Sequence, residues 1–182
     1  SKIVNEPSPY EARFPDILRL NDGRIMAVWH KAAEHARTTG VIRMSFGDSS
    51  GKTWSAPHNA LSSAGIVAGQ DTRDPKIGLM KDGSVVLTFF TAGGGIYYAV
   101  WKPGWNYFTA PKRLRRTGYC HGAPLALDTY NGRANEVLVP FYTWGSSSSH
   151  GAWYVRTRWQ ASTNTLSVIG SPRRIISNAN PV

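Results

Sequence analysis

Cysteine is almost absent from this sequence: Cys120 is the only one in 182 residues. A single cysteine excludes an internal disulfide, so cysteine usage leaves the cellular compartment open. No apolar run reaches the roughly 18 residues that a membrane-spanning helix needs, and we expect no membrane span. The first residues show no signal-peptide pattern, although a mature secreted chain would lack one too. We favour a secreted or cell-surface location.

Acidic residues are also scarce, with 11 Asp and Glu against 21 Lys and Arg and a net charge of +10. Such an excess predicts an acidic partner, which is a nucleic acid, an anionic surface or an anionic glycan. Apart from a local cluster at 112–116, the basic residues are spread along the chain, and no nucleic-acid-binding motif is present. We therefore expect no nucleic acid partner and favour an anionic carbohydrate ligand.

The composition disfavours a helical bundle, because Gly (18), Pro (11) and Trp (7) are abundant. It is typical of many short strands joined by turns. Hydrophobic residues make up 41% of the chain, so a chain of this length can bury a sizeable core. We expect a single domain that spans residues 1–182.

One unit of sequence recurs three times. Each copy has a short apolar run, an Asn-Gly or Asp-Gly pair and a second apolar run, which is the strongest short-range signal for a β-hairpin. The copies begin at Pro15, Pro75 and Pro124 and turn at Gly23, Gly83 and Gly132. A third strand follows at 41–46, 96–101 and 152–159, and a small residue before Pro57, Pro111 and Pro172 precedes a fourth. Four antiparallel strands in about 50 residues predict a β-propeller blade.

We therefore predict an all-β fold, a β-propeller of four-stranded antiparallel blades, with blades at about 10–62, 70–115 and 120–176. A meander of hairpins in a β-sandwich is the alternative. Propellers usually carry about four to eight blades, so three would form half of a six-bladed ring. Residues 178–182 resemble residues 5–8, where the first blade begins. We expect a missing C-terminal half, or a second copy of the chain in a homodimer, to complete the ring.

The stretch 47–54, GDSSGKTW, is rich in turn-forming residues. Its two glycines are too close for a phosphate-binding loop, and Asp48 alone cannot supply the several spaced acids of a calcium loop. We predict a structural turn between the third and fourth strands, in which Asp or Ser side chains accept backbone N–H groups and Trp54 anchors the turn. No other cofactor signal is present, and we expect neither a cofactor nor a metal.

This turn resembles the Asp-box, the S-x-D-x-G-x-T-W repeat of sialidases and related propeller proteins. Gly51, Thr53 and Trp54 match the repeat. Ser49 stands where Asp is usual, and Asp48 lies one residue early. We therefore predict a degraded copy of the Asp-box with a structural role.

Arg13-Phe14-Pro15 resembles the R-I-P element that opens the first sialidase blade. In that family the arginine is one of three that hold the substrate carboxylate, a task that suits a planar guanidinium. The resemblance assigns this role to Arg13. The family's tyrosine nucleophile, its glutamate partner and the other two arginines come from later blades, and nothing in this chain matches them.

Propeller geometry brings the starts of the first strands and the second-to-third-strand connections to one face, around a central concavity that is the default ligand site. In the first blade this face gathers Arg13, Asp16 and Arg37 as substrate-binding candidates. Sialidases carry an acid/base aspartate in the corresponding loop. Here the acid is Glu34, and His35 follows it, so either residue can transfer a proton to a glycosidic oxygen. A solvated loop with ordinary charges is the alternative.

The second blade places Asp71, Arg73 and Asp74 beside Pro75 at the same face. Packing these polar groups against a proline is costly unless they pair with each other or bind a ligand. We predict that Arg73 is held between Asp71 and Asp74. This arrangement either prepares Arg73 for an anionic or polyol ligand or forms a structural salt-bridge network between blades.

The third blade contributes Tyr119 and His121, which precede Pro124. His121 is a candidate for ligand binding or proton transfer, with a satisfied structural histidine as the alternative. Trp144 follows the second strand and is placed at the rim to stack on a sugar face, unless it packs into the blade. We interpret Cys120 as a small buried residue.

Three functions follow from these residues. The leading one is a sialidase-like exo-glycosidase, with Arg13 and Arg73 on the substrate carboxylate and Glu34 or His35 as the acid/base. The second is a polysaccharide lyase, in which basic side chains neutralise a uronate and His121 or Tyr119 abstracts the α-proton. The third is a glycan-binding module without catalysis. The unmatched nucleophile favours the second and third functions unless a partner chain supplies it.

Overall fold

The computed structural model describes residues 6–35, 39–62, 71–127, 133–144 and 150–176. These residues form strands and turns, and none of them lies in a helix long and apolar enough to cross a membrane. The first two sheets contain β1 (Glu11–Arg19), β2 (Ile25–Ala32), β3 (Val41–Gly47), β4 (His58–Asn59), β5 (Thr72–Leu79), β6 (Val85–Thr91), β7 (Ile96–Trp101) and β8 (Lys112–Arg115). The third contains β9 (Tyr119–Cys120), β10 (Leu125–Ala126), β11 (Glu136–Thr143), β12 (Gly151–Gln160), β13 (Thr165–Val168) and β14 (Arg173–Ile176).

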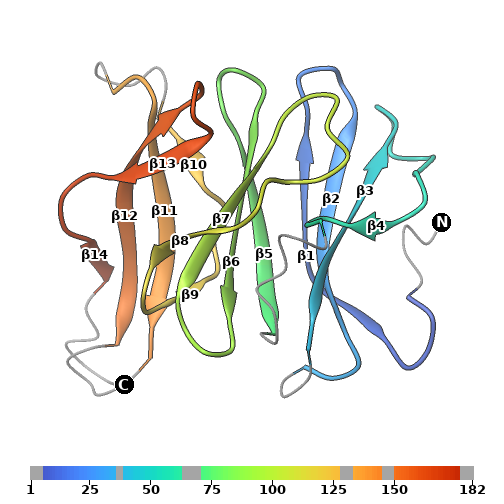
Figure 1. Cartoon of the computed structure of the whole chain (residues 1–182), viewed down its shortest axis with the longest axis horizontal. Coiled ribbons are helices and arrows are strands. Elements are labelled where there is room, and N and C mark those ends of the chain that lie inside the picture. The colour runs from blue at the N-terminus through green and yellow to red at the C-terminus, as the bar shows by residue number, and fades with distance from the viewer. Residues whose placement is uncertain (1–5, 36–38, 63–70, 128–132, 145–149, 177–182) are drawn as a thin grey trace.

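Each sheet is an antiparallel meander. The strand order is β1-β2-β3-β4 in the first, β5-β6-β7-β8 in the second and β10-β11-β12-β13 in the third. In the third sheet β9 also pairs with β11 and β14 with β12, so two short strands share each edge position. Figure 1 shows the three sheets side by side. They are the blades of a β-propeller, which confirms the predicted all-β fold with three blades in this chain, called blades one, two and three below.

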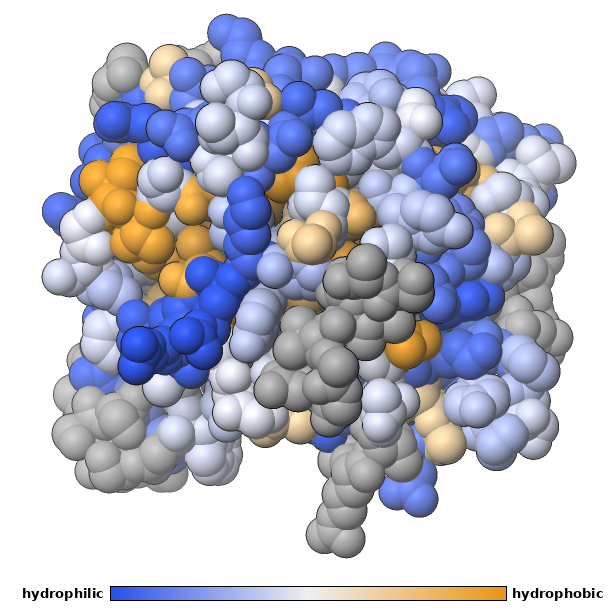
Figure 2. All heavy atoms as spheres, viewed as in Figure 1, coloured by the Kyte–Doolittle hydropathy of each residue, from blue (hydrophilic) through white to orange (hydrophobic). Residues whose placement is uncertain are grey.

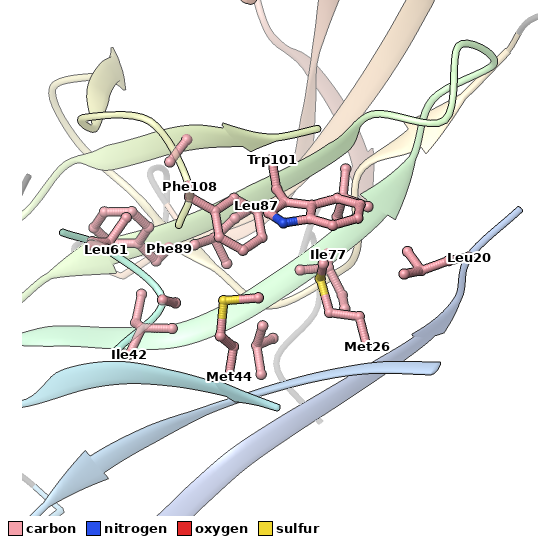
Figure 3. Close-up of a cluster of buried hydrophobic side chains, with 14 residues drawn as sticks. Leu20, Met26, Ile42, Met44, Leu61, Ile77, Leu87, Phe89, Trp101 and Phe108 are labelled. Carbon is pink, nitrogen blue, oxygen red and sulfur yellow. The ribbon is translucent and has the colours of Figure 1, made fainter. Parts of the chain in front are cut away.

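The hydrophobic core lies between the blades. Blades one and two interlock through Met26 and Met44 on one side and Leu87, Phe89 and Trp101 on the other, each at most 1% exposed (Figure 3). A second cluster joins blade two to blade three. Successive side chains of a strand point to opposite faces of its sheet. Because blade two has a neighbour on each face, every residue of β6 is buried.

The first strands of the blades lie next to each other. The Asp16 carboxylate on β1 accepts a hydrogen bond of 2.9 Å from the backbone N–H of Ile77 on β5. A Cβ on Gly78 would lie 2.1 Å from the carbonyl oxygen of Pro124, just before β10, so this close backbone approach requires glycine. In Figure 1 the Asp-Gly turns of blades one and two lie at the top. The starts of β1 and β5 and the β6–β7 turn lie at the opposite face, called the connection face below.

The turn at 47–54 confirms the predicted structural role, in which a side chain accepts backbone N–H groups and Trp54 anchors the turn. The Asp48 carboxylate accepts hydrogen bonds from the backbone N–H groups of Ser50, Lys52 and Thr53 and from the hydroxyls of Ser50 and Thr53. The indole N–H of Trp54 donates to the carbonyl of Gly51 at 3.0 Å. An aspartate one residue earlier than usual therefore accepts from three backbone N–H groups and two hydroxyls of the turn.

Asp48→Asn is expected to lower the melting temperature at neutral pH, because the donors of the turn lose a charged acceptor. Hydrogen bonds from Thr53 and then Ser50 hold the pKa of Asp48 well below its ordinary value of 3.8. A depressed pKa gives stabilisation that is complete above the unfolded-state value and is lost as the pH falls toward the folded-state pKa. The difference in melting temperature from the wild type should be largest at about pH 7 and shrink below about pH 4.

The control for Asp48→Asn is Glu34→Gln, which neutralises an exposed carboxylate and should leave the melting temperature unchanged. We expect the difference in melting temperature between Asp48→Asn and the wild type to shrink in acid. A difference that stays constant as the pH falls would contradict this account of the turn.

Candidate functional site

Blades one and two begin with the same local element, an acid two residues before an arginine and a proline two residues after it. Its members are Glu11, Arg13 and Pro15 in blade one and Asp71, Arg73 and Pro75 in blade two. A β-bulge follows each arginine. The residue between arginine and proline has a positive φ, 51° at Phe14 and 49° at Asp74. Left-handed backbone is strained in residues with side chains, and such strain concentrates at functional sites.

The two arginines are held differently. Arg13 pairs with Glu11, whose side chain is 56% exposed. Arg73 donates from Nε and Nη2 to one oxygen of Asp71, which is 7% exposed. The second oxygen of Asp71 lies 3.2 Å from Nε2 of the fully buried His30 and also accepts a backbone N–H. Arg73 is therefore fixed, while its Nη1 has no hydrogen bond within the described residues.

Asp74 turns toward blade three. Its carboxylate lies 3.5 Å from Nδ1 of His121, so Arg73 is held by Asp71 and not, as we predicted, between two aspartates. Asp74 is only 6% exposed. Burial raises its pKa, and the neighbouring His121 offsets only part of that rise. A carboxyl group with a raised pKa keeps its proton at higher pH, which suits a general acid.

Two aromatic rings extend this cluster. His121 is 66% exposed and meets the ring of Tyr142 edge to face, with 5.9 Å between centroids. Tyr142 stacks on Tyr119 at 5.1 Å. Burial, and then the charge of Asp74, raise the pKa of Tyr142, so its phenol stays protonated.

Sequence reasoning missed Tyr142, although strand alternation could have identified it. Phe141 is 3% exposed in the core between blades two and three. The next side chain on β11 must therefore face the other side of the sheet. Tyr142 lies directly opposite Tyr119 in the ladder between β11 and β9.

These residues form one continuous row across all three blades, called the axial row below. Its members are Arg13, Phe14, His30, His35, Asp71, Arg73, Asp74, Tyr119, His121 and Tyr142. Phe14 contacts the rings of His35 at 5.4 Å and His30 at 6.3 Å, and Arg13 lies opposite His30 in the ladder. Burial lowers the pKa of His30, while the charge of Asp71 opposes that change. The row thus brings together most of the residues predicted for the site.

Four predicted residues lie apart from the axial row or cannot be placed. Glu34 is exposed and forms no ion pair or hydrogen bond with another described residue. Asp16 ties β1 to Ile77 of β5. Arg37 lies outside the described residues. Trp144 lines a separate cavity between blades two and three.

Cys120 is fully buried, as expected, and burial raises the pKa of its thiol. Among the residues that the structure describes, no three or more His, Cys, Asp or Glu side chains lie together in a way that could hold a metal ion. The polar chemistry of the axial row therefore comes mainly from two carboxyl–imidazole pairs, two arginines and two phenols.

No protein-family model and no curated protein matches the chain. Among solved structures, it is similar to a protein of unknown function from Dyadobacter fermentans, with a TM-score of 0.67 and 15% identity over 91% of this chain and 56% of that one. The Hadza microbial sialidase Hz136 gives a TM-score of 0.60 and 14% identity over 90% of this chain and 38% of that chain. The NanB sialidase from Streptococcus pneumoniae gives a TM-score of 0.63 and 13% identity over 92% of this chain and 45% of that chain.

The chain thus spans about half or less of the length of these neighbours, between 38% and 56%. Identities of 13–15% relate the chain to them by fold. The three blades have the fold of a sialidase-like β-propeller.

Proposed function

We propose that this chain forms the ligand-binding and proton-transferring part of a sialidase-like glycoside hydrolase that acts on an anionic carbohydrate. One observation carries the proposal: the buried Asp74 carboxyl, with its raised pKa, lies beside the exposed imidazole of His121 on the connection face. In glycoside hydrolysis a carboxylic acid protonates the departing oxygen, and a raised pKa keeps it in the acid form.

Proton transfer is assigned to Asp74 and His121 in place of Glu34 or His35. Glu34 is exposed and lies apart from the axial row, whereas Asp74 has the burial that keeps a carboxyl group protonated. His121 orients the Asp74 carboxyl, whose proton goes to the departing oxygen, and the imidazolium form of His121 can return a proton to Asp74 afterwards.

The anionic group of the ligand is assigned to Arg73 and Arg13. Asp71 holds the guanidinium of Arg73 in place and leaves Nη1 to donate. The Nε of Arg13 is buried without a hydrogen-bond partner, and an anion would supply one. One structural neighbour, NanB, has been solved with an ethanesulfonate compound. The nucleophile is supplied by the blades that complete the ring, from a longer chain or from a second copy.

A polysaccharide lyase is the second candidate, and the His121–Asp74 pair favours it. Asp74 lies 3.5 Å from Nδ1 of His121, and in this mechanism the Nε2 atom abstracts the α-proton of a uronate. The electron pair left on carbon forms the new double bond as the bond to the departing oxygen breaks. The protonated phenol of Tyr142 donates its proton to that oxygen, while Arg73 neutralises the uronate carboxylate.

Three parallel assays separate these functions, each run on the completed ring, which is either the dimer of this chain or a longer chain that carries the remaining blades. We expect dye release from a fluorogenic sialoside, and loss of that release in Arg13→Ala. Ultraviolet absorbance from an unsaturated uronate, without dye release, would instead identify a lyase. Binding to a glycan array without turnover in either assay would leave a binding module. A chain that neither turns over nor binds anionic glycans would contradict the proposal.

A further inference from the structure

A second candidate site lies outside the axial row, in a cavity of about 640 Å³ between blades two and three. Its walls come from the β6–β7 turn, the segment that links β8 to β9, the end of β11 and Trp153 on β12. This volume is in the range of small-molecule sites. Tyr119 belongs both to this wall and to the axial row, so the two sites adjoin.

Two arginines in this cavity have no acidic partner among the described residues. Arg115 is half-buried, with its guanidinium 4.8 Å from the centre of the Phe141 ring, and its Nε is buried without a hydrogen-bond partner. Arg116 is exposed, and the cavity lining contains no Asp or Glu. Figure 2 shows strongly hydrophilic side chains gathered between the end of β8 and β12. A half-buried cation without a counter-ion is costly, and an anionic ligand would remove that cost.

The Phe141 ring on which Arg115 rests is itself fixed. Phe141 stacks on Trp153, with centroids 6.5 Å apart and planes 15° apart. The guanidinium of Arg174 lies 5.3 Å from the Trp153 ring. Arg115, Phe141, Trp153 and Arg174 therefore form one stack, and it holds the Arg115 guanidinium in place before any ligand arrives.

Trp144 offers the cavity a largely exposed aromatic ring, whereas Trp153 is covered by its stacking partners. Trp144 is 78% exposed, the highest value among the large hydrophobic side chains of the described residues. Its ring contact there is with His150, at 4.8 Å and an angle of 43°. An exposed aromatic ring that lines a cavity with two arginines leaves apolar surface in water, which a ligand packed against the ring would cover.

The backbone around the cavity is adapted to this arrangement. Gly118 has a φ of 115°, and a Cβ there would lie 2.8 Å from the Phe141 ring. Glycine therefore lets the segment that carries Arg115 and Arg116 pass directly over Phe141. A Cβ on Gly94, in the opposite wall, would meet nothing within 4 Å, so that wall leaves open space for a ligand.

From this geometry we infer that the cavity binds an anionic sugar residue, a pyranose that carries a carboxylate or a sulfate. Arg115 and Arg116 bind the anionic group, because guanidinium donors match its oxygens. Trp144 packs against the apolar face of the ring. The site does not depend on the reaction proposed for the axial row, and a glycan chain that passes Tyr119 would occupy both sites.

The test is a titration of the purified chain with a uronic acid oligosaccharide, a sulfated oligosaccharide and a neutral one of the same length, followed by calorimetry and tryptophan fluorescence. We expect the neutral probe to bind at least about tenfold more weakly than the better anionic one. The stronger of the two anionic probes identifies the group that the cavity prefers. Arg115→Gln and Trp144→Ala should each weaken binding of that probe about tenfold, the loss of one charged hydrogen bond or one stacking contact.

The matched control is Arg113→Gln, which removes the same charge from the exposed part of β8, outside the cavity. It should change affinity less than about twofold, because screened surface charges contribute little. Equal losses in Arg113→Gln and Arg115→Gln, no effect of Trp144→Ala, or no binding of either anionic probe would overturn the inference. His121→Ala changes the axial row and leaves the lining of the cavity intact. Binding of the anionic probe that persists in this variant therefore distinguishes the cavity from the axial row.

Discussion

Replacing Asp74 with asparagine is expected to reduce the turnover of an acidic glycoside by about 10²- to 10⁴-fold, the usual contribution of a general acid. Asparagine has nearly the same shape and tolerates the left-handed backbone that this position adopts, with its φ of 49°. The change therefore removes the transferable proton and leaves the local structure in place. Steady-state kinetics on the substrate identified by the assays above measure the effect.

The pH profile gives an independent readout of Asp74. Burial raises the pKa of this carboxyl above its ordinary value of 3.8. The active acid form is therefore lost as the pH rises through the raised pKa, and the wild-type rate should fall on that side of the profile. The residual rate of Asp74→Asn should lack this limb.

Asp74→Asn should lower activity but should not lower the stability of the fold. A carboxyl whose pKa is raised in the folded protein destabilises the fold at every pH where it is ionised, above its unfolded-state value. Asp74→Asn should therefore melt no lower than the wild type at neutral pH, and a lower melting temperature would mean that lost activity reflects lost structure. The control is Asp82→Asn, in the β5–β6 turn at the opposite face, which should keep full activity. Full activity in the Asp74→Asn variant would exclude Asp74 as the general acid.

The blades could be predicted from the sequence because their signals are local. An apolar strand, an Asp-Gly turn and a second apolar strand occupy consecutive residues, and this pattern recurs in register. The pairing of β1 with β2 and of β5 with β6 needs little else. Burial on both faces of β6 could also be anticipated, since 85–90 is apolar almost throughout and a central blade has two neighbours.

The partners of the site residues were harder to predict, because they depend on backbone irregularities. Alternation along a strand places Asp71 and Arg73 on the same face, and the structure pairs them. The side chain of Asp74 is re-aimed by the bulge and by its left-handed backbone, and it reaches His121 in the next blade. The propeller pattern alone specifies neither feature.

Two other features depend on the path of the chain and not on residue types alone. The pattern of the Asp-box fixes residue types at fixed offsets, but the path of the turn decides which carboxylate reaches the donors, and Asp48 does so from an unusual position. Trp144 was expected at the rim or packed into the blade; it is 78% exposed and lines the cavity between blades two and three. Which side of a blade a loop residue takes is set by the neighbouring blade, and the sequence of a single loop does not contain that information.

Asp71→Ala is expected to destabilise the fold by about 3–5 kcal/mol, the usual cost of removing one partner from a buried ion pair. Asp71 is 7% exposed and holds Arg73, His30 and the backbone N–H of Gly40, so its loss leaves all three without their acceptor. A loss of this size is a large part of the roughly 5–15 kcal/mol that stabilises a typical domain. Urea unfolding at neutral pH measures it as a shift of the midpoint.

The equivalent pair in blade one provides the matched control. Glu11 stands in the same relation to Arg13 as Asp71 does to Arg73, but its side chain is 56% exposed. Glu11→Ala should therefore cost no more than about 1 kcal/mol, because water replaces the lost partner. Asp71→Asn should fall between the two, since its amide oxygen still accepts from Gly40 while the charge opposite Arg73 is gone. If Glu11→Ala and Asp71→Ala lower the free energy of unfolding equally, the burial of Asp71 adds nothing to the stability of its ion pair.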